Sequence, residues 1–242
     1  MADQEIAKHT KQMWGILKGA EHGIWHKARE MLLEIFIIVF AVSVSIWFHS
    51  MAEHRHEQDK VRSFLLGLKH DIESDNDQIE GILAFHHASD ERYAYLASRD
   101  PGEAPDRDKF NAAYGLLNAN NFLVPRLARY EGFKSSGKLI NVEDDALLEK
   151  IVSHYEYSIP RAHFSWNGWN SAHRALQAFT EEKLGEDDSL TARYKAITSP
   201  KGKRLAERMV TFPQLYERHE GLQKEGKEII ADIDRMYPDQ AR

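Results

Sequence analysis

Cysteine is absent from this chain of 242 residues. Its absence excludes disulfide bonds, iron–sulfur clusters, zinc–thiolate sites and thiol nucleophiles. It does not separate a cytosolic from a periplasmic protein, because either kind can lack cysteine. An excess of positive charge is also missing, since 32 basic residues stand against 38 acidic ones and the net charge is -6. Nucleic-acid-binding proteins usually present a basic face, so no nucleic-acid partner is expected.

The known sequence motifs of catalysis are missing too. A serine-nucleophile motif, a glycine-rich dinucleotide loop and a paired-carboxylate signature are all absent from the sequence. Each of these motifs is needed to place particular groups around a reacting bond or a cofactor. The sequence therefore predicts no catalytic residue and no cofactor, and it favours a function in binding.

Long apolar runs are rare in this chain, whose mean hydropathy is -0.56, but one extends from Met31 to Phe48. All but one of its residues are apolar or small, and the exception is Glu34. A helix that crosses the roughly 30 Å hydrocarbon core of a bilayer needs about 20 such residues. A helix that is apolar on every face also needs apolar surroundings on every side. We therefore predict a transmembrane helix at residues 29–52 and a lipid bilayer as partner.

A cleaved signal peptide is the alternative interpretation of this run. Ser50, Met51 and Ala52 form an acceptable small-x-small cleavage site. However, a signal peptide has a short basic start and an apolar region of about 7–15 residues. Here a long segment containing Asp3, Glu5, Glu21 and Glu30 precedes a longer apolar run. An uncleaved anchor is the favoured interpretation.

Several residues in and beside the span have predicted roles. A carboxylate in hydrocarbon is costly, so Glu34 either reaches the interface, where a nearby basic residue neutralises it, or contacts another helix. Ser43 and Ser45 are predicted to add hydrogen bonds between helices. The predicted interface anchors are residues whose side chains favour the headgroup region: Trp25, Lys27, Arg29 and Trp47.

The basic residues nearest the span predict its orientation. Lys27 and Arg29 lie closest to the apolar run, and basic residues are enriched on the cytoplasmic side of a membrane. We expect the N-terminus in the cytoplasm and residues 53–242 outside it. Residues 1–28 form an amphipathic juxtamembrane segment, which either lies in the interface or begins one long helix continuous with the span.

Apolar residues recur every three or four positions after the span, as they do along a coiled coil. This seam consists of Val61, Leu65, Leu68, Ile72, Ile79 and Ile82. Asp75 occupies its one polar position. The seam predicts a helix that continues from the membrane as a stalk to about Ser98 and contributes to the core of the following domain.

The remainder of the chain also has helical patterns. Gly137 is expected to end one helix, Asn141 to cap a helix from Glu143 to about Tyr157, and Pro160 to start another. No stretch alternates as a β-strand does. The predicted fold class is all-α: a single transmembrane helix that continues into a long stalk helix and a helical-bundle domain at residues 53–242.

Two segments resemble a family of uncharacterised bacterial membrane proteins. REMLLEIFIIVFAVSVSIWF, followed at once by charged residues, is similar to the glutamate-bearing span that opens these proteins, although it lacks the family's glycines and asparagine-rich exit. The segment from Tyr130 to Tyr157 resembles the family's Tyr-Glu…Ser-Gly…Leu…Tyr-Tyr pattern. The matching positions are Tyr130, Glu131, Ser136, Gly137, Leu148 and Tyr155. The resemblance implies a single-pass bacterial membrane protein with a helical domain, and with the orientation given above we expect it in the inner membrane with residues 53–242 in the periplasm. It transfers no catalytic residue, because the family's domain has no known function.

Aromatic and small residues in the second half of the chain are candidates for a partner-binding patch or for the core. They are Tyr130, Glu131, Gly137, Trp166 and Trp169. Aromatic residues at helical spacing are more often core residues, with their polar atoms hydrogen-bonded to neighbours. The turn around Gly137 is better interpreted as a helix end than as a phosphate-binding loop, because a second glycine is missing and the helix dipole is negative there.

Histidine is abundant, with 13 residues, and this raises the possibility of a metal site. His22 and His26 have the spacing of two ligands on one helix face, but Gly23 stands where the H-E-x-x-H motif has its glutamate. A zinc site needs three or four converging ligands. Nothing in the sequence brings three histidines together, so no metal ligand is assigned.

The leading hypothesis is a membrane-anchored helical protein that acts by binding, as a scaffold or an envelope sensor, without catalytic activity. It is expected to contact the bilayer and either a second copy of itself or another membrane protein. A histidine-dependent metal-binding protein or metalloenzyme is the alternative. A membrane-perturbing effector, whose span oligomerises in the bilayer, is a weaker alternative.

Overall fold

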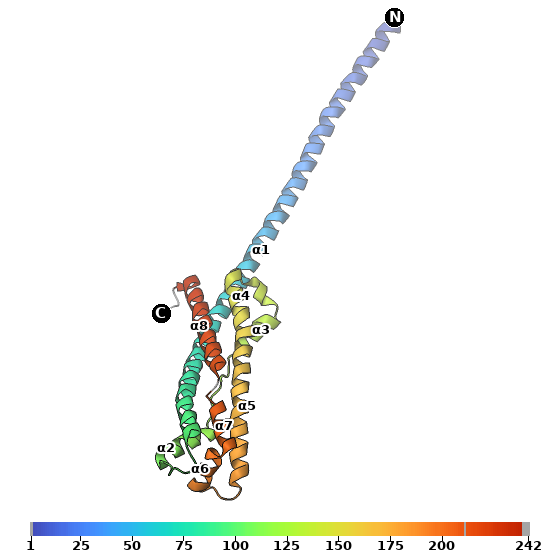
Figure 1. Cartoon of the computed structure of the whole chain (residues 1–242). Coiled ribbons are helices and arrows are strands. Elements are labelled where there is room, and N and C mark those ends of the chain that lie inside the picture. Colours follow the sequence, from blue (N-terminus) through green and yellow to red (C-terminus); the bar gives the residue numbers. More distant parts are fainter. Residues whose placement is uncertain (1, 211, 239–242) are drawn as a thin grey trace. The chain divides into compact units, whose positions relative to one another are not determined.

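A computed structural model describes the backbone of residues 2–210 and 212–238, and the side chains of this range from residue 29 onward. All regular structure within it is helical, which confirms the predicted all-α class. The chain divides into two compact units, residues 1–59 and residues 60–242. Helix α1 (Ala2–Ser98) contributes to both units, because it continues from the apolar segment into the seam without a break (Figure 1).

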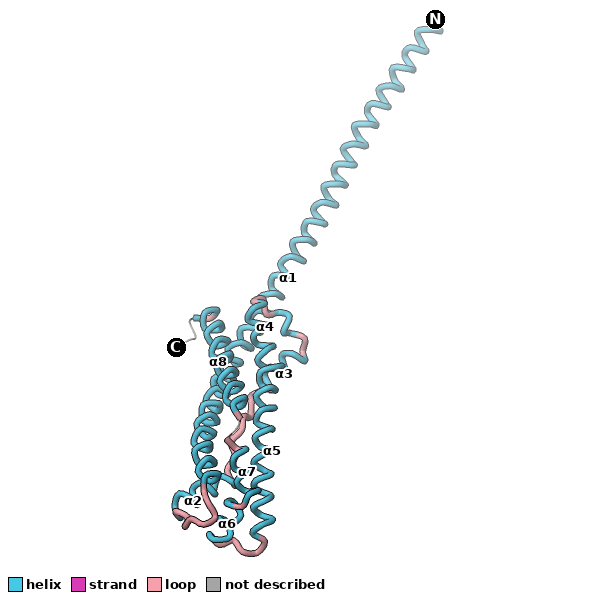
Figure 2. The backbone as a smooth tube through the Cα atoms, in the orientation of Figure 1, coloured by secondary structure: helices cyan, strands magenta, loops and turns pink. Residues whose placement is uncertain are grey.

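The second unit is built on three long helical segments: the C-terminal part of α1, α5 (Ile159–Leu184) and α8 (Pro213–Met236). The sequence colours of Figure 1 show α5 running in the same direction as the C-terminal part of α1, and Figure 2 shows these helices and the loops that join the elements as a smooth tube. Helix α8 runs the opposite way, since Lys69 Nζ lies 2.5 Å from Asp234 Oδ1 while Tyr216 Oη donates to Asp90 Oδ2. Lys69 precedes Asp90 along α1, whereas its partner Asp234 follows Tyr216 along α8, so the two helices are antiparallel.

Shorter helices close the two ends of this bundle. Helices α3 (Ala128–Ser135) and α4 (Asp145–Ser153) lie at one end, and α2 (Arg107–Tyr114), α6 (Leu190–Thr198) and α7 (Pro200–Arg208) lie at the other (Figure 1). Short 3₁₀ helices occupy Gly115–Asn118 and Lys138–Asn141. Several of the N-termini have a side-chain cap of the expected kind, for example Ser189, which accepts from the Ala192 N–H.

The turn after α3 has the predicted glycine, but the predicted cap of the next helix is wrong. Gly137 has a φ of 71°, a left-handed conformation that glycine adopts without strain. Asn141 lies in the 3₁₀ helix, and the N-cap of α4 is Asp144, whose carboxylate accepts from the Leu147 N–H at 3.0 Å. Asparagine and aspartate are comparable caps, so the sequence did not distinguish the two positions.

The expected break at Pro160 is also absent, because a π-helical turn at His154–Ser158 joins α4 to α5. Proline has no N–H to donate, and its ring clashes with the carbonyl four residues earlier. Within this turn the Ile159 N–H bonds to the His154 carbonyl, five residues back, which widens the helix just ahead of the proline. The chain therefore passes Pro160 without leaving the helical path.

The buried core has two apolar clusters. One contains the predicted seam of α1 together with residues of α3, α4 and α8, and its fully buried members include Leu65, Leu68 and Ile72. The other surrounds Trp169 and includes residues of α2, α6 and α7. Buried histidines lie at intermediate positions of the long helices: His86 follows the seam on α1, and His219 precedes Leu222 on α8.

Helices α1 and α8 approach closely at Gly226. A Cβ atom at this position would lie 2.9 Å from both Ile72 Cγ2 and Asn76 Oδ1. Gly221, on the same helix, has nothing within 4 Å of the place where its Cβ would be. The two glycines therefore have different reasons to be there, and only Gly226 is required by packing.

This difference predicts a contrast between two alanine substitutions in one helix. Gly221→Ala is expected to stabilise the bundle by about 0.5–1 kcal/mol, because alanine is the better helix former. Gly226→Ala is expected to be less stable than Gly221→Ala by about 1–3 kcal/mol, because the added methyl overpacks the α1–α8 contact. Urea unfolding of the two variants measures this, and equal midpoints would contradict the close approach.

Candidate functional site

The first candidate is the apolar segment of α1, residues 31–48. Apart from Val44, which is partly buried, its large apolar side chains keep between 47% and 66% of their surface exposed. One helix of the described chain is long and apolar enough to cross a membrane, and none of its apolar window is buried within the protein. The segment therefore is not a core helix of this chain, and its apolar surface faces whatever medium surrounds it.

The predicted membrane-contact residues all lie on this open surface. Glu34, Ser43 and Ser45 are exposed, as are the predicted interface anchors Arg29 and Trp47. The remaining anchors, Trp25 and Lys27, lie outside the described side chains. The positions that are described are thus accessible to lipid or to another helix.

Tyr130 belongs to the core, where it stacks on Tyr155 with ring centroids 4.3 Å apart. Its hydroxyl donates to Glu156 Oε1 at 2.9 Å, and Lys134 Nζ donates to the same oxygen at 2.5 Å. Glu131, the next residue along, is exposed. This part of the Tyr130–Tyr157 segment therefore holds α3 against the π-helical turn.

Asp75, the polar position of the seam, is buried and accepts hydrogen bonds from a loop. The Arg126 N–H donates to its two oxygens at 3.2 and 3.1 Å, and Gln78 Nε2 donates at 3.3 Å. Burial raises the pKa of Asp75, although the bond from Arg126 acts to lower it. Gln78 also exchanges hydrogen bonds with the backbone of Val124, so the two side chains fasten the loop before α3 to α1.

Trp169 lies in a layer of buried histidines. Its ring stacks on His173 with centroids 4.9 Å apart and meets His86 edge-on at 4.7 Å. His173 Nε2 lies 3.0 Å from the Leu116 carbonyl, and His219 Nδ1 lies 2.7 Å from the Leu215 carbonyl. Trp166, in contrast, is only partly buried and donates to the Asn121 carbonyl.

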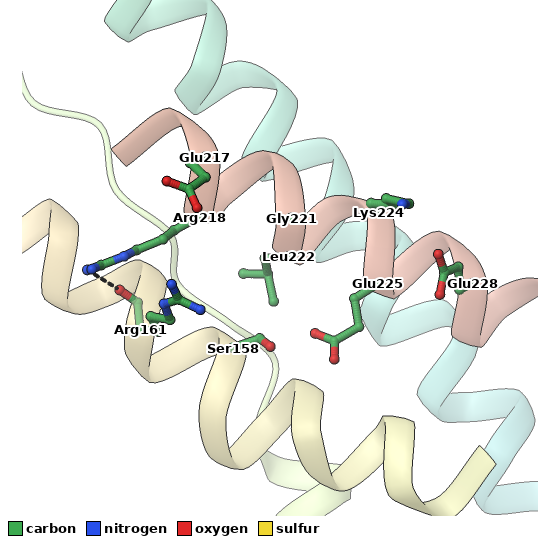
Figure 3. A pocket seen from close by; sticks show the side chains of 9 residues that line it. All are labelled: Ser158, Arg161, Glu217, Arg218, Gly221, Leu222, Lys224, Glu225 and Glu228. Atoms are coloured by element: carbon green, nitrogen blue, oxygen red, sulfur yellow. Dashed lines mark hydrogen bonds between the residues drawn. The ribbon is translucent and has the colours of Figure 1, made fainter. Parts of the chain in front are cut away.

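The second candidate is a pocket between the π-helical turn and α8. Its volume is about 450 Å³, within the range of small-molecule sites. Figure 3 shows α5 on one side and α8 on the other. The lining residues are Ser158, Arg161, Glu217, Arg218, Gly221, Leu222, Lys224, Glu225 and Glu228.

Glu225 is the half-buried carboxylate of this pocket. Burial acts to raise its pKa, but hydrogen bonds from His154, Ser158 and Ser153 outweigh burial, and the net pKa is lowered. His154 is almost fully buried, and its Nδ1 lies 3.4 Å from Glu225 Oε2. The wide turn places His154 and Ser158 against α8, so Glu225 is held as a carboxylate at neutral pH.

Two arginines line the other end of the pocket. Arg218 Nη1 donates to the Arg161 carbonyl at 3.4 Å and Nη2 donates to Gln214 Oε1, while the buried Nε has no partner among the described residues. Each guanidinium lies over an aromatic ring, Arg161 at 5.7 Å from Tyr157 and Arg218 at 5.9 Å from Phe164. In the described part of the chain neither forms an ion pair, so both charges are available.

The alternative hypothesis of a metal-binding protein has no candidate metal site among the described side chains. No three histidine, aspartate or glutamate side chains among them are arranged to hold a metal ion. His22 and His26 lie outside the described side chains.

The buried histidine layer predicts that stability falls in mild acid. Burial lowers the pKa of His86 from 6.5 to about 4, and it lowers the pKa of His173 and His219 as well. Between pH 6.5 and about pH 4, His86 binds a proton in the unfolded chain but not in the folded one. The free energy of unfolding is therefore highest above about pH 6.5 and falls as the pH approaches 4. The pKa shift of His86 accounts for a loss of about 3 kcal/mol in the free energy of unfolding at low pH.

Urea unfolding of the full chain in uncharged detergent at pH 7 and pH 4.5 measures this loss. His86→Leu is expected to reduce it, whereas His70→Leu, at a side chain that is 75% exposed, is the matched control. An undiminished loss in His86→Leu would contradict the assignment.

No family model matches the chain, and no curated protein or solved structure matches it. The resemblance to the bacterial membrane family stays a prediction from the sequence.

Proposed function

We propose that this protein is a membrane-anchored helical binding protein, held in a bilayer by residues 29–52 and carrying a bundle that binds a ligand or a partner. The observation that supports the anchor is that no residue in the apolar window of α1 is buried within the described chain, and nearly all of its large side chains are exposed. Burying one large apolar side chain is worth about 1.5–3 kcal/mol, and this segment contains many of them. A bilayer supplies the apolar surroundings that the described chain does not.

The binding part of the proposal is supported by the pocket between the π-helical turn and α8. Glu225 lies beside buried His154, and Arg161 and Arg218 each lie over an aromatic ring, yet the two arginines have no acidic partner among the described residues. Charges held in place in a concave surface are suited to recognition, because less side-chain freedom is lost when a ligand binds.

The location and orientation are part of the same proposal. We place the protein in the inner membrane of a bacterium, with the N-terminus in the cytoplasm and the bundle in the periplasm. Lys27 and Arg29 beside the apolar run support this orientation, and the sequence resemblance supports the type of membrane.

Membrane extraction tests the anchor. The full chain is expected to sediment with membranes and to resist alkaline carbonate. Lysine at the centre of a membrane helix costs about 2.5–3.5 kcal/mol, so Ile38→Lys combined with Val42→Lys is expected to weaken insertion. Ile38→Leu combined with Val42→Leu is the matched control and should stay in the pellet.

Two outcomes would contradict the anchor. One is wild-type protein that stays in the supernatant after ultracentrifugation without detergent. The other is a mature protein whose N-terminus lies near residue 53, which would identify the apolar run as a cleaved signal peptide.

Cysteine labelling tests the orientation, and the absence of native cysteine makes each introduced thiol unique. With the outer membrane permeabilised, a membrane-impermeant maleimide is expected to label Gly102→Cys and to leave Thr10→Cys unlabelled until the inner membrane is broken. The reverse pattern would overturn the orientation and leave the anchor intact.

A further inference from the structure

The pocket at the π-helical turn has two arginines at one end, where Glu217 also lies, and the carboxylate of Glu225 toward the other end, which Lys224 and Glu228 also line. Figure 3 shows the guanidinium groups of Arg161 and Arg218 near one end and the carboxylate of Glu225 toward the other. Arg218 and Glu225 are two helical turns apart on one face of α8, a rise of about 10 Å. Buried Leu222 lies between them.

Both ends of the pocket are prepared for a charged group. The carboxylate of Glu225 is half-buried, and its Oε2 lies 3.4 Å from the Nδ1 atom of buried His154. Arg161 and Arg218 are supported by aromatic rings, and the buried Nε of Arg218 has no partner within the described chain. The guanidiniums of Arg161 and Arg218 have no carboxylate partner among the described residues, so their terminal nitrogens can bind an anion at that end of the pocket.

A simple anion or a simple cation would complement only one end. An anion near the arginines would leave Glu225 without a lysine or arginine partner among the described residues, and a lone cation near Glu225 would leave both guanidiniums unpaired. A molecule that carries both charges complements the two ends together, and the hydroxyl of Ser158 lies along the path between them.

We propose that this pocket binds a zwitterion, with the ligand's carboxylate or phosphate at Arg161 and Arg218 and its primary ammonium at Glu225. The inference deepens the proposed binding function and rests on it. Two sources carry this chemistry: a free short peptide, whose termini are about 10 Å apart for three extended residues, and the headgroup of an amine-bearing phospholipid, in which the two charges are closer.

Gly221 offers a way to block the pocket without disturbing the fold. It lines the pocket, and a Cβ atom there meets nothing within 4 Å. Gly221→Leu therefore places its side chain in the open space of the pocket. Gly81→Leu is the matched control, because Gly81 is also an exposed helical glycine with no neighbour around its Cβ position, and it does not line the pocket.

Isothermal titration of the full chain in maltoside micelles tests the proposal with two probes, tri-alanine and glycerophosphoethanolamine. At least one is expected to bind. N-acetylation or C-terminal amidation removes one charge from tri-alanine and is expected to weaken its binding at least tenfold. N-acetylation of glycerophosphoethanolamine removes its positive charge and is expected to weaken its binding at least tenfold as well. Whichever probe binds identifies the source.

The variants supply the second readout. Glu225→Gln, Arg161→Gln and Gly221→Leu are each expected to weaken binding at least tenfold, while Gly81→Leu binds as the wild type does. Lack of binding by both probes, equal binding of blocked and free forms, or wild-type affinity in Gly221→Leu would overturn the proposal. None of these outcomes affects sedimentation with membranes, so failure here is distinguishable from failure of the proposed anchor.

Discussion

The removal of one apolar surface from water is the constraint on which the rest of this account depends. The large side chains between Met31 and Phe48 make no apolar core with the described chain, and all of them except Val44 keep about half or more of their surface exposed. At about 1.5–3 kcal/mol for each side chain fully buried, leaving this surface in water costs on the order of 10 kcal/mol or more. That is comparable to the entire free energy of unfolding of a domain, about 5–15 kcal/mol. The hydrocarbon of the proposed bilayer would remove this cost, and the helical form satisfies the backbone hydrogen bonds inside the segment.

The second unit uses the same helix differently. After residue 60, α1 is apolar on one side only, and that side is covered by α4, α5 and α8. Close packing at Gly226 brings α8 against α1, and the π-helical turn brings His154 and Ser158 against Glu225. The charged pocket is therefore a consequence of how α8 packs: one of its faces meets the seam of α1, and the next face carries Arg218 and Glu225 toward α5.

Local patterns were sufficient for much of the fold. The seam from Val61 to Ile82 is buried as its periodicity predicts, and Gly137 ends a helix in the conformation that favours glycine. The sequence predicted the N-cap at Asn141 and not at Asp144, because both residue types are suitable caps. It also predicted a helix break before Pro160, because a π-helical turn has no distinctive sequence signal. The pocket was missed for another reason. His154 and Glu225 are far apart in sequence, and only the packing of α5 on α8 brings them within 3.4 Å.

Collision measurements on a single spin label test the central claim most directly. A label at Val39→Cys, with the full chain in bilayer nanodiscs, is expected to collide often with dissolved oxygen and rarely with a water-soluble nickel chelate, because oxygen concentrates in hydrocarbon and the chelate is excluded from it. A label at Gly102→Cys, in the loop after α1, should show the opposite preference. If the chelate reached Val39→Cys as readily as Gly102→Cys, the apolar segment would lie in water and the account would be wrong.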